Sequence, residues 1–534
     1  MTDHEDRDKT SVARANEPRL SRRGVLRAAG NAAAMVAFPF VGTTPISAAA
    51  EVAQDFDVPE GGEKTAADYP ISEIMTRLSN YISQARDQVL PDEVLEKAKW
   101  ALLDTFAAIV SGSQLPAGRA AIKFARSYGG KPVSTVIGDE TLCGPIEAAL
   151  LNGVMGHADE TDDYGRAVHP GANTVPAALA LGEQFGISGA HFLRAMTVGY
   201  DIGARVMVAA GVQMNFRVPT NSMGGNFAAT AAAACAASQT AQQTRRAVAY
   251  AAQQDSGIDD FRRDLVHIEK AFMNSGMGAR NGVTSALLVL AGFNGVNDIM
   301  GGPVSFFTRY AETARPEQLI EKLGEQYYVA HPNFKHWPVG APVQVPIDSL
   351  QAMLKRQAID PNQVREVIVR YGGGPGSITD NGGSPDINVQ QAVALMLIDK
   401  KLTFKSIHDY ARMKDPAIVR LRSITKVIPL TSGFGGNDAA RPPAIEIALT
   451  DGTHLTQDVL SAGVPGTVSD PYTREWVVGK ARSLMTPVLG AAHTTELVDR
   501  VLKLEDTKNI RELRPLLQQR YTDGPPRLSD WPMA

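Results

Sequence analysis

Long apolar stretches rich in alanine and glycine constrain the fold of this chain most. In the segment Asp92–Ser111, for example, Val94, Leu95, Ala98 and Ala101 recur at three- and four-residue spacing, with charged residues between them. Small residues on most sides of a helix let its neighbours approach closely, so the sequence predicts a large bundle of packed helices. Further helices are predicted at 146–156, 175–185, 190–209 (with Ser188 as its cap), 225–238, 243–253 and 280–291.

The pattern changes after about residue 335. Residues 364–371 alternate apolar and polar, and 444–449 and 455–459 predict two strands joined by an Asp451-Gly452 turn. Helical patterns at 388–398 and 407–421 lie between these strands. The sequence therefore predicts a mainly α fold with an α+β insertion, in which a large helical bundle domain carries a smaller α+β lid domain.

The predicted organisation follows from these patterns. Helical patterns return at 475–485, 494–504 and 510–520, and these helices are expected to rejoin the bundle. We expect the helical domain at 69–335, the α+β lid domain at 336–465, C-terminal helices completing the helical domain at 466–520, and a tail at 521–534.

The first residues are typical of an export signal. Ser21-Arg22-Arg23 precedes an alanine-rich stretch that ends in Ser47-Ala48-Ala49-Ala50. This order predicts a twin-arginine-type signal peptide at 1–50 followed by a linker at 51–68; a disordered basic tail is the alternative. We therefore expect a periplasmic protein, exported by the twin-arginine route, with no stable membrane association after removal of the signal.

Charge and cysteine content exclude some functions. The chain has 53 basic and 57 acidic residues, a net charge of −4, so no nucleic-acid partner is expected. Its two cysteines cannot supply the thiolates of an iron–sulfur cluster or a thiolate zinc site.

The densest polar cluster lies between two of the predicted helices. Four carboxylates and two histidines occur between His157 and His169, and such crowding shifts pKa values toward those useful for proton transfer. A solvated acidic loop that caps the next helix is the alternative. His157, Asp159 and His169 also suggest a metal site, but they lack the His-x-x-x-His spacing, so no metal is predicted.

Two later clusters carry cationic residues. Lys270 and Arg280 surround a glycine-rich segment at 276–282 that can approach an anion, although the glycines equally suit close helix packing. Lys335 and His336 lie among aromatic and proline residues where the bundle gives way to the second pattern. This junction suits either a ligand site or a stiff hinge.

Together these motifs resemble the MmgE/PrpD family, which includes 2-methylcitrate dehydratase and cis-aconitate decarboxylase. The resemblance covers nearly all of 70–515 and is carried by 102–108, by 152–163 with His169-Pro170, by 199–205, by 279–293 and by 335–338. Two departures are a missing family histidine around 216–220 and Gly340, which stands where some members carry a histidine.

The resemblance implies a helical domain, an inserted lid, a site between them and a homodimer. It also implies a metal-independent lyase without a cofactor, most simply a hydro-lyase of the 2-methylcitrate dehydratase type that abstracts a proton next to a carboxylate of a di- or tricarboxylic acid. A decarboxylase, an epimerase or isomerase, and a non-catalytic periplasmic organic-acid binding protein are the alternatives, followed by a zinc hydrolase. The implied catalytic residues are Asp159, His169 (oriented by Asp159) and Lys270, and the implied substrate-binding residues are Asp163, Arg280, Lys335 and His336.

Overall fold

The computed structural model describes residues 70–165, 169–211, 220–258, 263–311, 313–371, 376–429, 443–458 and 471–519. The predicted signal peptide, the linker at 51–68 and the tail at 521–534 lie outside these residues. The described chain is mostly helical with two small sheets, which confirms the predicted fold class. None of the helices in these ranges is long and apolar enough to cross a membrane.

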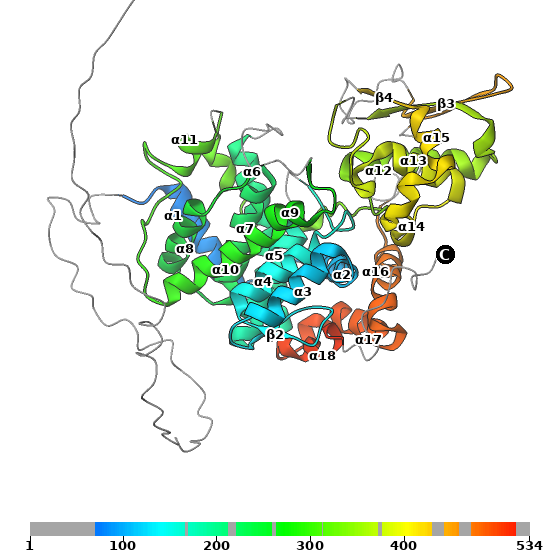
Figure 1. The fold of residues 1–534 in the computed structure, drawn as a ribbon. Helices are drawn as coiled ribbons and strands as arrows, with labels where there is room; N and C mark the ends of the chain where they lie inside the picture. The colour runs from blue at the N-terminus through cyan, green and yellow to red at the C-terminus, as the bar shows by residue number, and fades with distance from the viewer. Residues whose placement is uncertain are drawn as a thin grey trace, which may run out of the picture. The chain divides into compact units, whose positions relative to one another are not determined.

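Most of the helices form one assembly, here called the helical part (Figure 1). Its small two-stranded sheet pairs β1 (Ser134–Thr135) with β2 (Leu142–Cys143), and neither strand was predicted. The helices are α1 (Glu73–Gln84), α2 (Asp92–Gly112), α3 (Pro116–Tyr128), α4 (Pro145–Gly156), α5 (Pro170–Phe185), α6 (Gly189–Ala210), α7 (Thr220–Ala236), α8 (Ala241–Gln253), α9 (Ile268–Ala271), α10 (Met277–Leu290), α11 (Phe306–Tyr310), α16 (Arg474–Leu489), α17 (Ala491–Leu502) and α18 (Arg514–Leu517).

Small residues set the spacing in the centre of the helical part. A Cβ added at Gly282 of α10 would lie 2.4 Å from the backbone carbon of Ala229 in α7. A Cβ at Gly199 of α6 would lie 2.8 Å from the carbonyl oxygen of Ala228 in the same helix α7. Both glycines therefore let a neighbouring helix approach α7 more closely than any other residue would allow.

The C-terminal helices return to the first half of the chain. Helix α16 packs along α2, which precedes it by more than 360 residues in the sequence (Figure 1). Val477 and Leu484 of α16 belong to the same apolar core as Leu102 and Phe106 of α2. The segment 337–458, which lies between α11 and α16 in the chain, has its own separate core.

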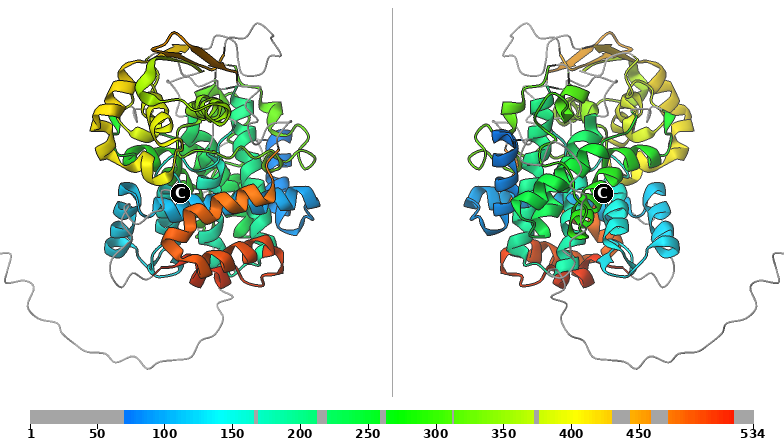
Figure 2. Two further views of the ribbon diagram at one scale, coloured as in Figure 1. Left: turned by 90° about the vertical axis from the view of Figure 1, so that its right-hand side faces the viewer. Right: turned by 90° about the vertical axis from the view of Figure 1, so that its left-hand side faces the viewer.

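That intervening segment, here called the α+β part, contains a four-stranded sheet with helices on one face (Figure 2). The strand order is β4-β3-β5-β6, with β3 parallel to β4 and antiparallel to β5. Strand β3 buries Val367, Val369 and Tyr371 and turns the residues between them outward, as its alternation predicts. The elements are α12 (Ala341–Arg356), β3 (Val364–Tyr371), α13 (Val389–Asp399), α14 (Phe404–His408), α15 (Pro416–Ser423), β4 (Thr425–Pro429), β5 (Ile445–Leu449) and β6 (His454–Gln457).

Several predicted elements differ from the structure. The predicted helix 407–421 is wrong, because Asp409 and Asp415 each accept a hydrogen bond from a backbone N–H two residues on and so start new turns. The chain there forms α14, a 3₁₀ turn and α15. The predicted helix 510–520 begins as a 3₁₀ turn and ends at Leu517. Strand β4 was not predicted.

Candidate active site

The polar segment between α4 and α5, residues 157–169, is folded into the protein. His157, Asp159 and Asp162 are fully buried, so the solvated alternative is wrong. The loop does bond to the start of the next helix, as that alternative expected: Asp163 Oδ1 accepts a hydrogen bond of 3.0 Å from the Gly171 N–H in the first turn of α5. A Cβ at Gly171 would lie 2.7 Å from that same oxygen, so glycine is required for this contact.

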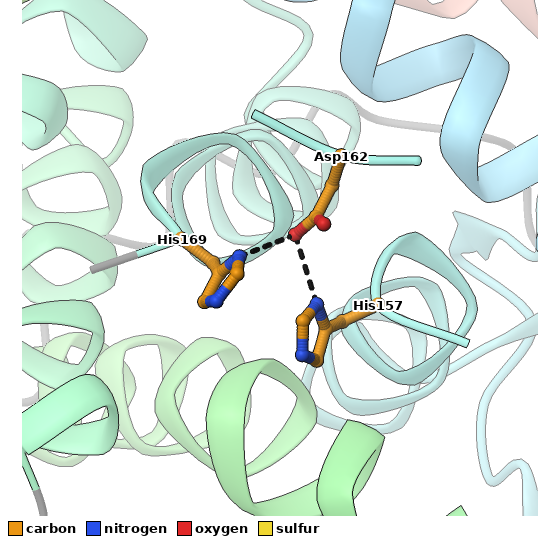
Figure 3. Close-up of side chains that lie close together, drawn as sticks. All are labelled: His157, Asp162 and His169. Carbon is orange, nitrogen blue, oxygen red and sulfur yellow. Dashed lines mark hydrogen bonds and ion pairs between the residues drawn. The ribbon is translucent and has the colours of Figure 1, made fainter. Parts of the chain in front are cut away.

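One carboxylate of this loop joins its two histidines (Figure 3). Asp162 Oδ2 lies 3.0 Å from His157 Nδ1 and 2.9 Å from His169 Nδ1. Burial opposes ionisation of Asp162, but the Lys335 ammonium and the two imidazoles hold its pKa well below the usual range. Asp162 is therefore an acceptor, and both Nδ1 atoms donate to it.

This arrangement leaves His169 with a basic nitrogen. Because its Nδ1 donates to Asp162, Nε2 is the ring nitrogen that can accept a proton. Within the described ranges, no hydrogen bond reaches Nε2, and His169 is 9% exposed. A histidine held at Nδ1 by a carboxylate, with Nε2 available, is the arrangement that general acid–base catalysis requires.

Two lysines hold the loop from other elements. Lys335 Nζ donates to Glu160 Oε2 at 2.6 Å and to Asp162 Oδ1 at 2.8 Å. Lys270 Nζ is hydrogen-bonded to the other Glu160 oxygen and lies 2.8 Å from His157 Nε2. Burial opposes ionisation of Glu160, yet the charges of both lysines hold its pKa well below the usual range.

Irregular backbone around Lys270 brings this lysine and Asn274 close to the loop 157–169. His267 has a left-handed φ of 59°, and a π-helical turn at 272–276 separates α9 from α10. Lys270 before this turn and Asn274 within it both reach Nε2 of His157, Asn274 at 3.1 Å. Burial and the Lys270 charge lower the pKa of His157 well below its usual value, which keeps the ring neutral.

Two contacts come from the α+β part. His267 Nδ1 lies 2.8 Å from Asp386 Oδ2, and His408 Nε2 lies 3.5 Å from Asp159 Oδ2. Burial opposes ionisation of Asp386, but His267 lowers its pKa to about 2. Burial raises the pKa of Asp159, which favours its acid form. The loop 157–169 and the residues that contact it, here called the cluster, therefore include side chains from both the helical part and the α+β part.

A cavity of about 300 Å³ opens beside Lys335. Its lining includes Lys335, Lys401, Lys405 and Lys480 together with His336, and no aspartate or glutamate of the described chain lines it. His336 is held at Nδ1 by Asp348, 3.1 Å away, rather than by the histidine cluster. The lining favours an anionic ligand.

The structure corrects two of the predicted positions. Asp159 does not orient His169, because its Oδ1 accepts from Thr161 Oγ1 at 2.7 Å and Asp162 takes the expected place. Arg280 lies outside the cluster: among the described residues its guanidinium is hydrogen-bonded to Asn281, 2.9 Å away, and lies over the Phe272 ring.

Several members of the cluster are not among the site residues predicted from the sequence. His157, Glu160 and Asp162 are in the loop already singled out, but local spacing does not say which carboxylate faces which histidine. His267 lies three residues before Lys270. Asp386 and His408 carry no local signal, because only the tertiary structure brings them to the loop.

Two groups in the described chain have the donor atoms for a metal ion. The ligand atoms of His157, Asp162 and His169 lie within 4.8 Å of one another, as do those of His157, Glu160 and His267. In the first group Asp162 Oδ2 already accepts from both histidines, and Lys335 contacts the other Asp162 oxygen. In the second group the Lys270 ammonium is hydrogen-bonded to His157, Glu160 and His267. These cations compete with a metal ion for the same atoms.

Comparison with known proteins decides the family. The MmgE/PrpD N-terminal domain matches residues 76–319, and the MmgE/PrpD C-terminal domain matches residues 337–504. The chain belongs to the MmgE/PrpD family. Lys335 and His336 lie between the two matched ranges, just before the second one begins.

Curated relatives of this MmgE/PrpD protein cover most of its length. The cis-aconitate decarboxylase-like protein oryM of Aspergillus oryzae is 26% identical over 84% of this chain and 98% of its own. A cis-aconitate decarboxylase of Aspergillus terreus is 23% identical over 84% of this chain and 96% of its own. The human cis-aconitate decarboxylase is 24% identical over 80% of this chain and 91% of its own.

Proposed function

We propose that this protein is an organic-acid lyase, with His169 transferring a proton at the carbon next to a carboxylate of a di- or tricarboxylic acid. The observation that carries the proposal is the buried Asp162–His169 pair, 2.9 Å long, which fixes Nδ1 as the donor and leaves Nε2 as the base. The family and its named decarboxylase relatives support a lyase.

The neighbouring charges suit such a reaction. Removing a proton beside a carboxylate places a second negative charge on that group, and lysines held in place stabilise this charge as it develops. The lysine-lined cavity beside Lys335 supplies the cationic surroundings for an anionic substrate. Asp159, whose acid form burial favours, is our candidate for returning a proton.

Two bond cleavages are compatible with these groups. In dehydration, the reaction expected from the sequence, His169 takes the α-hydrogen and the C–O bond breaks, with the leaving hydroxide protonated by an acid. In decarboxylation, which the names of the relatives favour, the C–C bond breaks and the resulting carbanion receives a proton. Both reactions pass through a carbanion stabilised by a carboxylate.

Proton NMR in deuterated water tests the proposal and separates the two reactions. The purified protein is incubated with citrate, 2-methylcitrate and cis-aconitate, and each product is identified. Loss of water, loss of carbon dioxide, or deuterium incorporation next to a carboxylate supports a lyase of this kind. Unchanged acids that calorimetry shows to be bound would instead support the non-catalytic binding protein, and elemental analysis of the same sample tests the zinc alternative.

A further inference from the structure

Glu160 lies between Lys270 and Lys335, the two lysines that hold the loop 157–169. One of its carboxylate oxygens is hydrogen-bonded to Lys270, and the other accepts from Lys335 at 2.6 Å. The Glu160 side chain is 4% exposed, and the Lys335 side chain is fully buried. A single internal carboxylate therefore bridges the ammonium groups of Lys270, an expected catalytic residue, and Lys335, an expected substrate-binding residue.

Bridging by a carboxylate is what two buried lysines require. A buried ammonium group without an anion is costly, and a carboxylate with one oxygen on each lysine satisfies both. The lysines come from separate elements, Lys270 from α9 and Lys335 from the segment that leads into α12. A substrate carboxylate between them would make the same two contacts that Glu160 makes.

Lys335 also separates the cluster from the lysine-lined cavity. Its Nζ faces Glu160 and Asp162, while the residue lines the cavity together with Lys401, Lys405 and Lys480. Lys480 is itself held by Asp104, 2.5 Å away, and by the Thr161 carbonyl oxygen. Lys401, Lys405 and Lys480 thus make the cavity side cationic, whereas Glu160 already takes the position between Lys270 and Lys335.

We propose that Glu160 is a specificity-determining residue whose carboxylate replaces one substrate carboxylate between Lys270 and Lys335. The protein then selects an organic acid with one carboxylate fewer than the same site would accept without Glu160, a dicarboxylate rather than a tricarboxylate. This inference rests on the proposed function and adds to it the number of charges on the substrate.

The test compares wild type with Glu160→Ala, which removes the carboxylate and leaves room for a substrate carboxylate between the two lysines. Calorimetry measures the dissociation constants of butyrate, glutarate and tricarballylate, which place one, two and three carboxylates on the same three-carbon chain. In the variant, the affinity for tricarballylate relative to glutarate should rise about tenfold or more, the size expected for one additional charge-assisted contact. The inference is overturned if this ratio is the same, within about twofold, in both proteins.

Two further measurements guard against loss of stability. Glu183→Ala is the matched control, because Glu183 is also a buried glutamate paired with a cation, Arg514, but belongs to a different network. Its ratio should equal that of wild type. In the wild-type protein alone, glutarate should bind at least as tightly as tricarballylate. Wild type that binds tricarballylate about tenfold more tightly contradicts the inference even if the Glu160 variant does not fold.

Chemical rescue adds an independent readout. Glu160→Ala leaves room for a small anion between the lysines, so formate should raise its thermal midpoint more than that of wild type. Equal shifts in the two proteins would contradict the inference. The exchange experiment in deuterated water does not depend on these ratios, so the proposed function and the role of Glu160 can fail separately.

Discussion

Asp162 and Asp163 follow one another in the chain, yet they face two different regions of the loop between α4 and α5. Asp162 faces Lys335 and the two histidines, and these groups hold its pKa well below the usual range in spite of burial. Asp163 faces Tyr200, whose hydroxyl donates to it at 2.8 Å, and burial together with the nearby Asp104 and Asp162 carboxylates raises its pKa to about 7.

The difference shows how one loop supports two roles. Environments that push the pKa values of neighbouring carboxyls apart allow one to remain an anion while the other is protonated. Asp162 is the anion that orients His169. Asp163 instead accepts a hydrogen bond from the first turn of α5, and with Tyr164 and Tyr200 it lines a second cavity of about 310 Å³. Substitutions at four positions test this difference, and their expected effects decrease from Asp162 to Arg280.

Replacing Asp162 should have the largest effect on turnover. In Asp162→Asn the amide no longer fixes the His169 Nδ1 proton, so kcat should fall by roughly 10²–10⁴-fold, as for other orienting carboxylates. Steady-state turnover of the substrate identified by NMR is the measurement. Asp201→Asn, another fully buried aspartate with hydrogen bonds of its own, is the control, and an equal loss in both variants would refute the orienting role.

Replacing Lys335 should have the largest effect on stability. Lys335→Met leaves Glu160 and Asp162 buried without one of their cations, which should lower the free energy of unfolding by about 3–5 kcal/mol. Lys426→Met removes a largely exposed lysine from its pair with Glu366 and should cost no more than about 1 kcal/mol. Urea unfolding of both variants measures the difference, and similar losses would contradict the assigned environments.

The raised pKa of Asp163 predicts how stability depends on pH. Its pKa is about 7 in the folded protein and near 3.8 in the unfolded chain, so the folded state holds the proton more tightly. Stability contributed by this group is complete below about pH 4 and falls as the pH rises toward and past 7. Between pH 5 and 8 the wild type should lose on the order of 2 kcal/mol more than Asp163→Asn. Parallel pH profiles for the two proteins would show that Asp163 does not titrate in this way.

Replacing Arg280 should have the smallest effect. Its guanidinium is hydrogen-bonded to the neighbouring Asn281 and lies over Phe272, outside the cluster. Arg280→Gln should therefore change kcat/KM by no more than about twofold, equivalent to about 0.5 kcal/mol. A loss comparable to that of Asp162→Asn would show that Arg280 acts on the substrate, as the family resemblance implied.

The fold was largely predictable because its signals are local. The alanine-rich runs and the alternation of 364–371 specify helices and a strand by their periodicity, and the structure contains them with small shifts of their ends. The helix predicted at 407–421 was wrong because two aspartates, Asp409 and Asp415, cap short turns inside an apparently helical pattern.

The site was only partly predictable. Lys270, Lys335 and the loop 157–169 stand out as polar clusters, and the structure brings all three together. The partner of His169 was assigned to Asp159 instead of Asp162, since an irregular loop has no period that fixes the direction of its side chains. His408 and Asp386 were missed because their contacts join segments more than 100 residues apart.

Hydrogen exchange at the α-carbon of the substrate, followed by NMR in deuterated water, tests the central claim most directly. Wild type should incorporate deuterium next to a carboxylate, and folded His169→Gln should do so at least about 10²-fold more slowly, because Nε2 is the base that removes the proton. Equal exchange rates in the two proteins would contradict the assignment of His169.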